Sequence, residues 1–179
     1  MQRRLATITI SGAVLAFLAA ATPNARACSV PGLPSMRPAI VLPSSLFAPA
    51  TPKPAGAPVS IVGLWHVKFY SEGFLTDDAF DAWHSDGTEI LNDFTDPIED
   101  NVCLGVWSQS GETYRLRHPS WTFDTGGNLT GIAVIAELVT LAADGNSYSG
   151  TYSINLFDTA GNPVGTYQGT LKAERITAN

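Results

Sequence analysis

Proton-transfer chemistry in this 179-residue chain would depend on a small set of imidazole, carboxyl and phenol side chains. Such groups exchange protons near neutral pH when burial or a neighbouring charge adjusts their pKa values. His118 is the leading candidate, because alternation places it on one strand face with Tyr114 and Leu116. A histidine that is simply hydrogen-bonded within a wall of side chains is the competing interpretation. The candidates are His66, His84, His118, Asp81, Glu89, Glu137, Tyr114, Tyr148 and Tyr152.

Two carboxylates could assist a histidine, and the turns beside them decide whether they do. A two-residue turn at Asp144-Gly145 points Glu137 inward, where a carboxylate is costly to bury and becomes a functional-site candidate. A three-residue turn with a bulge sends it to solvent instead. A two-residue Asp86-Gly87 turn places His84 opposite Glu89, as a dyad or as a solvated surface pair. We name His118, Glu137 and His84 as candidate catalytic residues.

Several other chemistries lack their motifs in this sequence. It contains no G-x-S-x-G elbow, no HExxH and no glycine-rich phosphate loop, and neither a CxxC nor a Cys/His cluster. The acidic loop 93–101 fits no EF-hand spacing, so solvated carboxylates are the simpler interpretation. We therefore expect no cofactor and no metal. The formal charge of −6 and the pI of about 4.8 argue against nucleic acid and anionic membranes as partners.

The elements that position these residues are predicted to be strands. From residue 59 onward, short alternating segments are separated by Asp-Gly, Ser-Gly and Gly-Asn turns, without a long helical pattern. A three-residue loop ending at Gly111 is expected to join 102–107 to 113–118. In that register Val102, Leu104 and Val106 face inward with Tyr114, while Cys103 and Trp107 face outward. Pro119 is expected to end the second strand.

Aromatic residues recur at positions that could face the interior of such a sheet. They would either line an apolar cavity or fill it, because small closed sheets have room for packed side chains or for one small ligand. The expected ligand-binding residues are Trp83, Tyr114, Trp121, Tyr148 and Tyr152.

The two ends of the domain indicate how the sheet closes. Alternation in 61–70 places Trp65 on the apolar face, and Arg175 joins the apolar face of the closing segment 164–176. If these segments pair antiparallel, the guanidinium of Arg175 covers the Trp65 indole, a cation–π contact of roughly 0.5–2 kcal/mol. We therefore predict an all-β fold, an antiparallel up-and-down β-barrel of about eight strands, which removes exposed sheet edges.

The residues Gly63, Trp65 and Arg175 resemble the G-x-W motif and terminal arginine of the lipocalin-like, or calycin, superfamily. The resemblance covers the ends of the domain, and it implies a small barrel whose base these three residues close. The Thr-Asp-Tyr motif and a C-terminal helix are lacking. The resemblance is therefore to a divergent bacterial member rather than to a classical transport lipocalin.

The N-terminal part of the chain differs in composition from the rest. Residues 1–27 combine a basic start, an apolar stretch and a small-x-small cleavage pattern, as in a signal peptide. Residues 28–58 form a Pro-rich linker or arm, and 59–179 form the barrel domain. The two cysteines, Cys28 and Cys103, predict one disulfide in an oxidising compartment. Lipid modification at Cys28 is the alternative, although the preceding residues depart from the lipoprotein pattern.

These features predict a secreted or periplasmic barrel that binds a small apolar or aromatic molecule. The first alternative is a barrel-type cyclase, isomerase or lyase that uses His118 with Glu137 or a tyrosine. The second is a barrel packed solid with side chains, acting as a structural or cell-envelope interaction domain. Inward-pointing polar residues would separate the first two functions, and a measured cavity would exclude the third.

Overall fold

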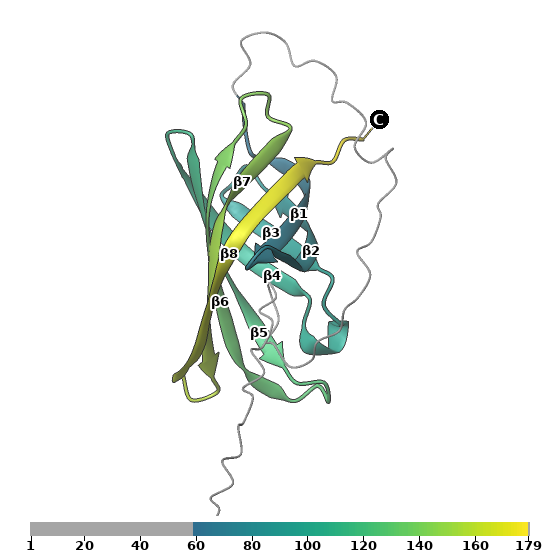
Figure 1. The fold of residues 1–179 in the computed structure, drawn as a ribbon, viewed down its shortest axis with the longest axis vertical. Helices are drawn as coiled ribbons and strands as arrows, with labels where there is room; N and C mark the ends of the chain where they lie inside the picture. The colour runs from purple at the N-terminus through teal and green to yellow at the C-terminus, as the bar shows by residue number, and fades with distance from the viewer. Residues whose placement is uncertain (1–58, 179) are drawn as a thin grey trace, which may run out of the picture.

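The computed structural model describes residues 59–178, which form one closed barrel of eight antiparallel strands (Figure 1). Each strand pairs with its neighbours in the sequence, and the last strand returns to pair with the first. This confirms the predicted all-β, up-and-down fold. The strands are β1 (Gly63–Ser71), β2 (Phe74–Trp83), β3 (Thr88–Asp93), β4 (Val102–Ser110), β5 (Thr113–Phe123), β6 (Leu129–Leu141), β7 (Ser147–Asp158) and β8 (Pro163–Arg175).

Helical structure within residues 59–178 is limited to the 3-10 turn η2 (Pro97–Glu99). No helix in this range is long and apolar enough to cross a membrane. The predicted signal peptide (1–27) and Pro-rich arm (28–58) lie outside the described residues, as does Cys28.

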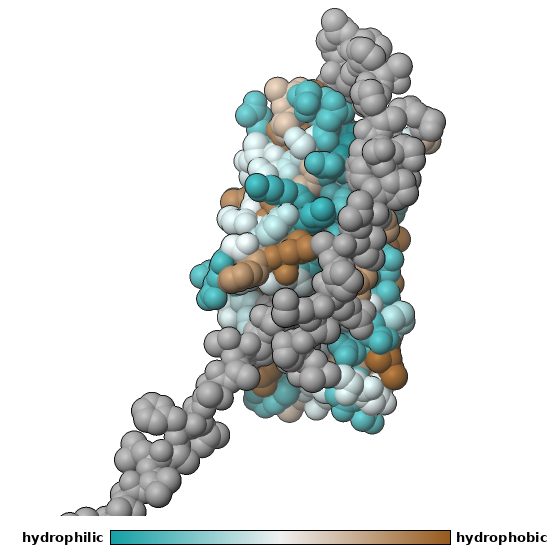
Figure 2. All heavy atoms as spheres, turned by 45° about the vertical axis from the view of Figure 1, so that its right-hand side comes forward, coloured by the Kyte–Doolittle hydropathy of each residue, from teal (hydrophilic) through white to brown (hydrophobic). Residues whose placement is uncertain are grey.

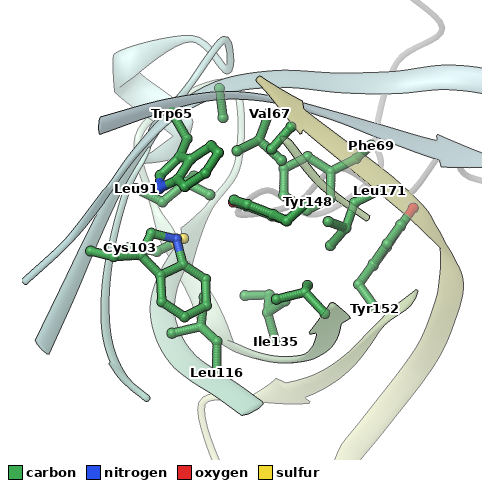
Figure 3. Packing of buried hydrophobic residues seen from close by; sticks show 14 of the residues in the cluster. Trp65, Val67, Phe69, Leu91, Cys103, Leu116, Ile135, Tyr148, Tyr152 and Leu171 are labelled. Atoms are coloured by element: carbon green, nitrogen blue, oxygen red, sulfur yellow. The ribbon is translucent and has the colours of Figure 1, made fainter. Parts of the chain in front are cut away.

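The barrel interior is built by strict alternation along the strands. In β5, for example, Tyr114, Leu116 and His118 are buried, whereas Arg115 and Arg117 between them are exposed. The inward-facing side chains point toward one another inside the ring of strands (Figure 3). On the outside, hydrophobic and hydrophilic residues are mixed, as on the face in Figure 2. Burial of one face thus selects the register of each strand.

The closing contact between β1 and β8 is the predicted one. Trp65 lies opposite Arg175, whose guanidinium carbon is 4.0 Å from the centroid of the indole ring. The guanidinium also donates hydrogen bonds to three backbone carbonyls, of Gly145 (2.7 Å), Val62 (2.9 Å) and Ser60 (2.6 Å). Arg175 therefore ties together the chain before β1, the β6–β7 turn and the end of β8.

The glycine of the G-x-W pattern has a physical reason in this contact. Gly63 has a φ of 143°, a backbone conformation that side chains disfavour. A Cβ atom at this position would lie 2.4 Å from Nη1 of Arg175. The absence of a side chain lets the guanidinium reach across β1, so Gly63, Trp65 and Arg175 form one unit.

The predicted register of β4 and β5 is wrong by three residues, an odd number that exchanges the two faces of β4. The strands are joined by a two-residue Gly111-Glu112 turn, in which Gly111 has the positive φ (63°) that glycine readily adopts. Trp107 consequently lies opposite Leu116, and Cys103 is fully buried. The residues expected inside, Val102, Leu104 and Val106, are exposed.

Two further expectations about the strands are corrected. The β2–β3 loop is longer by one residue than predicted, because the backbone of His84 pairs with Thr88, and Trp83 lies opposite Glu89. The pairing of His84 with Glu89, as a dyad or as a solvated surface pair, therefore does not form. Pro119 does not end its strand, since β5 continues through it to Phe123.

Replacing Arg175 tests the closure. We expect Arg175→Ala to lower the free energy of unfolding by roughly 2–4 kcal/mol, because charge-assisted hydrogen bonds and a cation–π contact are lost together. Arg175→Lys should recover only part of this, since an ammonium cannot reach three carbonyls from the same position. Urea unfolding followed by tryptophan fluorescence measures both. Lys172→Ala, an exposed change on the same strand, is the control, and equal unfolding midpoints for Arg175→Ala and the control would contradict this account.

Candidate functional site

Four ionisable side chains from four strands meet inside the barrel. His118 comes from β5, Glu89 from β3, Glu137 from β6 and Asp81 from β2. Their residues are 0%, 1%, 4% and 0% exposed, respectively. Glu89 Oε2 lies 3.3 Å from His118 Nδ1, and Glu137 Oε1 lies 3.5 Å from His118 Nε2. Each nitrogen of the imidazole therefore faces a different carboxyl group.

The approach of Glu89 to His118 depends on a glycine in β4. Gly105 lies opposite Glu89 in the β3–β4 ladder. A Cβ atom at Gly105 would lie 2.1 Å from Glu89 Oε2 and 3.0 Å from the Cβ of His118. The missing side chain therefore provides the space in which the carboxyl group reaches the imidazole.

Asp81 connects this cluster to the closed end of the barrel. Its Oδ2 atom accepts hydrogen bonds from the Trp83 indole (2.5 Å) and from the Tyr148 hydroxyl (2.8 Å). The Tyr148 ring in turn packs edge-on against Trp65, with ring centroids 4.8 Å apart. The polar cluster and the Trp65–Arg175 closure thus share Tyr148 as a common neighbour.

The electrostatic environment keeps protons on this cluster. Burial alone lowers the pKa of His118, but its hydrogen bonds and charge interactions with Glu137 and Glu89 raise it to about 10. Burial raises the pKa of Asp81 well above its usual range, and repulsion from Glu89 adds to this. Burial also raises the pKa of Glu137, although His118 opposes the shift. His118 is therefore an imidazolium at neutral pH, and Asp81 and Glu137 retain their protons to a higher pH than free carboxyl groups do.

The hydrogen-bonding capacity of the cluster is only partly used. Asp81 Oδ1 and both oxygens of Glu89 and Glu137 are buried without a well-formed hydrogen bond. Buried acceptors are normally satisfied, so a concentration of such atoms needs an explanation. Among residues 59–178, no three His, Cys, Asp or Glu side chains are arranged to hold a metal ion. What the cluster offers chemically is a set of acceptors for a donor, above all for a cation.

The structure brings together two of the three predicted catalytic residues, His118 and Glu137. The inward position of Glu137, opposite Tyr152, is the one that the two-residue Asp144-Gly145 register predicts. The third, His84, is exposed and faces Thr88, with 3.2 Å between Nδ1 and Oγ1.

Four of the five expected ligand-binding aromatics lie inside, namely Trp83, Tyr114, Tyr148 and Tyr152. The fifth, Trp121, is 57% exposed on the outer face, which corrects the expectation that it lines the interior. Because β5 continues through Pro119, Trp121 stays on the same face as Arg115 and Arg117.

Asp81 and Glu89 were acid–base candidates that sequence reasoning did not place in this site. Asp81 lies two residues before Trp83 in the same strand, so an inward Trp83 implies an inward Asp81. The inward position of Glu89 could have been predicted only from the length of the β2–β3 turn, because that length places Glu89 opposite Trp83.

Of the two cysteines in the predicted disulfide, only Cys103 lies within the described residues. Cys103 lies on the inward face of β4, within the hydrophobic core (Figure 3). Its expected partner, Cys28, lies outside the described residues, so the pairing stays a prediction.

No family model, curated protein or solved structure matches this chain. The closed barrel is compatible with a lipocalin-like fold, and the function has to be argued from the geometry of the chain itself.

The buried imidazolium predicts an unusual pH dependence of stability. The folded chain holds the His118 proton up to a pKa of about 10, against about 6.5 when unfolded. The resulting stabilisation is complete below the unfolded pKa and is lost as the pH rises toward the folded one. We therefore expect the free energy of unfolding to fall between about pH 6.5 and pH 10. The raised pKa values of Asp81 and Glu137 act in the same direction.

Urea unfolding across this pH range measures the effect, and NMR of the imidazole nitrogens reports the protonation of His118 directly. The exposed variant His84→Gln should keep the same slope. A stability that stays level or increases with pH, or a neutral His118 ring at pH 8, would rule out the assigned charge state.

Proposed function

We propose that this chain is a small-molecule-binding barrel whose interior holds the cationic group of an amine with an aromatic or apolar body. The observation that carries the proposal is the buried cluster of Asp81, Glu89 and Glu137 around a single His118, in which several carboxyl oxygens lack a well-formed hydrogen bond. Three acidic groups against one basic group make the interior acidic in character. A ligand cation would supply the donors that these oxygens lack.

The surroundings of the cluster favour an amine over a metal ion. A protonated primary amine has three N–H donors, which carboxyl oxygens from several strands can accept. The rings of Trp83, Tyr148 and Tyr114 lie nearby, with the Trp83 centroid 5.8 Å from that of Tyr148 and 6.2 Å from that of Tyr114. Aromatic faces attract cations and also pack against a flat apolar body.

The charge state of His118 favours binding over catalysis by this histidine. A general base must be able to accept a proton at the working pH. His118 already holds its proton at neutral pH, and both ring nitrogens face carboxyl groups. Its role in the proposed function is to orient Glu89 and Glu137.

We also propose that the chain is exported, because residues 1–27 have the pattern of a signal peptide. An exported barrel would meet its ligand in the periplasm or outside the cell. Native mass spectrometry of the protein purified from its own periplasm would report a retained ligand, a lipid on Cys28 and the 2 Da mass loss of a disulfide.

A matched pair of probes tests the proposed ligand class. We expect 2-phenylethylamine to bind at least tenfold more tightly than 2-phenylethanol, which has the same ring but no charge, a difference of about 1.4 kcal/mol. Glu137→Gln and Glu89→Gln should each abolish this preference, whereas the exposed control Glu112→Gln should retain it. Calorimetry in buffers with different ionisation enthalpies should detect proton release on binding, because carboxyl groups with raised pKa values must ionise.

Equal affinity for the amine and the alcohol would contradict the role of the acidic cluster. Failure of both probes, together with a ligand-free mass of the periplasmic protein, would favour a barrel filled by its own side chains.

A further inference from the structure

The outer surface of β5–β8 contains a second feature, on the face of the sheet opposite to the barrel interior. It is a groove of about 850 Å³ whose outward-facing polar side chains are Arg115, Arg117, Thr151, Ser153, Gln168 and Thr170. We call it the outer groove. The strand register arranges these residues in two rows across the sheet, one from Arg117 through Ser153 to Gln168 and one from Arg115 through Thr151 to Thr170.

The two arginines are positively charged residues on a barrel whose charged side chains are mostly acidic. All 16 Asp and Glu residues of the chain lie at or after Glu72. The basic residues within 59–178 are Lys68, Arg115, Arg117, Lys172 and Arg175, and Arg175 is used in closing the barrel. Neither Arg115 nor Arg117 forms an ion pair with another residue in 59–178.

The spacing of the arginines suits a repeating anion. Residues two apart on a strand project from the same face at a separation of about 7 Å. Each guanidinium can hold a carboxylate through two parallel hydrogen bonds. Two such groups in line along β5 therefore present paired sites to an extended chain that carries one carboxylate per repeat.

The remainder of the outer groove is suited to sugar hydroxyls. Thr151, Ser153, Thr170 and Gln168 offer hydroxyl and amide groups that both donate and accept hydrogen bonds. Ala136 and Leu138 lie between these residues and the arginines, providing apolar surface for the carbon face of a sugar ring. The acidic residues elsewhere on the barrel repel any polyanion, and they disfavour the dense phosphate charge of a nucleic acid more strongly than one carboxylate per sugar.

We propose that the outer groove binds a linear acidic polysaccharide of the polyuronate class. Arg115 and Arg117 pair with carboxylates of the sugar chain, and the Ser, Thr and Gln side chains of β7 and β8 bind its hydroxyls. The acidic surroundings confine the polyanion to this groove. The lining of the groove includes Glu137 of the proposed amine site, but the side chains that bind the sugar chain project from the opposite face of the sheet.

The probe is polygalacturonate, and its fully methyl-esterified form is the uncharged control. We expect the charged polymer to bind at low salt, with a Kd that increases as salt screens the charges, and the esterified polymer to bind at least tenfold more weakly. Arg115→Ala and Arg117→Ala should each raise the Kd about tenfold. Lys68→Ala, which removes the same charge from β1 outside the groove, should change it less than twofold. Ser153→Ala and Gln168→Ala should weaken binding of the sugar polymer at constant charge.

Three results would overturn the proposal: no binding of polygalacturonate at low salt, equal effects of Lys68→Ala and Arg115→Ala, or equally tight binding of inorganic polyphosphate. The last would indicate a surface that attracts any polyanion. Because both arginines are exposed, Arg115→Ala and Arg117→Ala should leave the thermal unfolding temperature unchanged. A loss of polymer binding can then be distinguished from a loss of folding. Loss of amine binding in the interior would leave these results unaffected.

Discussion

The structure depends on the pairing of β1 with β8, which starts at Trp65 and Arg175 and joins the two strands that are farthest apart in the sequence. Without this ladder, the sheet would be an open ribbon with β1 and β8 as exposed edges. The arginine does more than cover an indole, since its three hydrogen bonds hold the segment before β1 and the β6–β7 turn. Gly63 makes this arrangement sterically feasible. Closing the ring is what creates an interior from which water is excluded.

That interior then imposes the chemistry of the buried cluster. Groups such as Glu137 and Asp81 would ionise freely in water, but in the closed barrel their charged forms lose solvation. The barrel compensates by surrounding one imidazolium with carboxyl groups and by giving Asp81 donors from Trp83 and Tyr148. Tyr148 also packs on Trp65, so the residue that completes the polar network is held by the residue that closes the ring.

Sequence reasoning predicted what depends on alternation and missed what depends on turn length. The eight-stranded architecture and the Trp65–Arg175 pairing follow from period-two patterns and from the ends of the domain. Turn length shifts a register by one residue and exchanges the two faces of a strand. For Glu137, the sequence allowed two registers, and the structure has the one that points this residue inward. Cys103 was assigned to the wrong face and Glu89 to the wrong partner. Neither Gly111 nor Asp86-Gly87 distinguishes a two-residue from a three-residue loop by composition alone.

The position of the cluster is itself an argument for function. Inward positions of a small barrel are filled most stably by apolar residues, and replacing buried ionic groups by apolar ones is often neutral or stabilising. Yet four ionisable residues occupy such positions here, and Gly105 removes a side chain so that two of them can meet. A purely structural barrel has no need of this arrangement. Local rules are broken in this way mainly at functional sites, where stability is given up for a specific interaction.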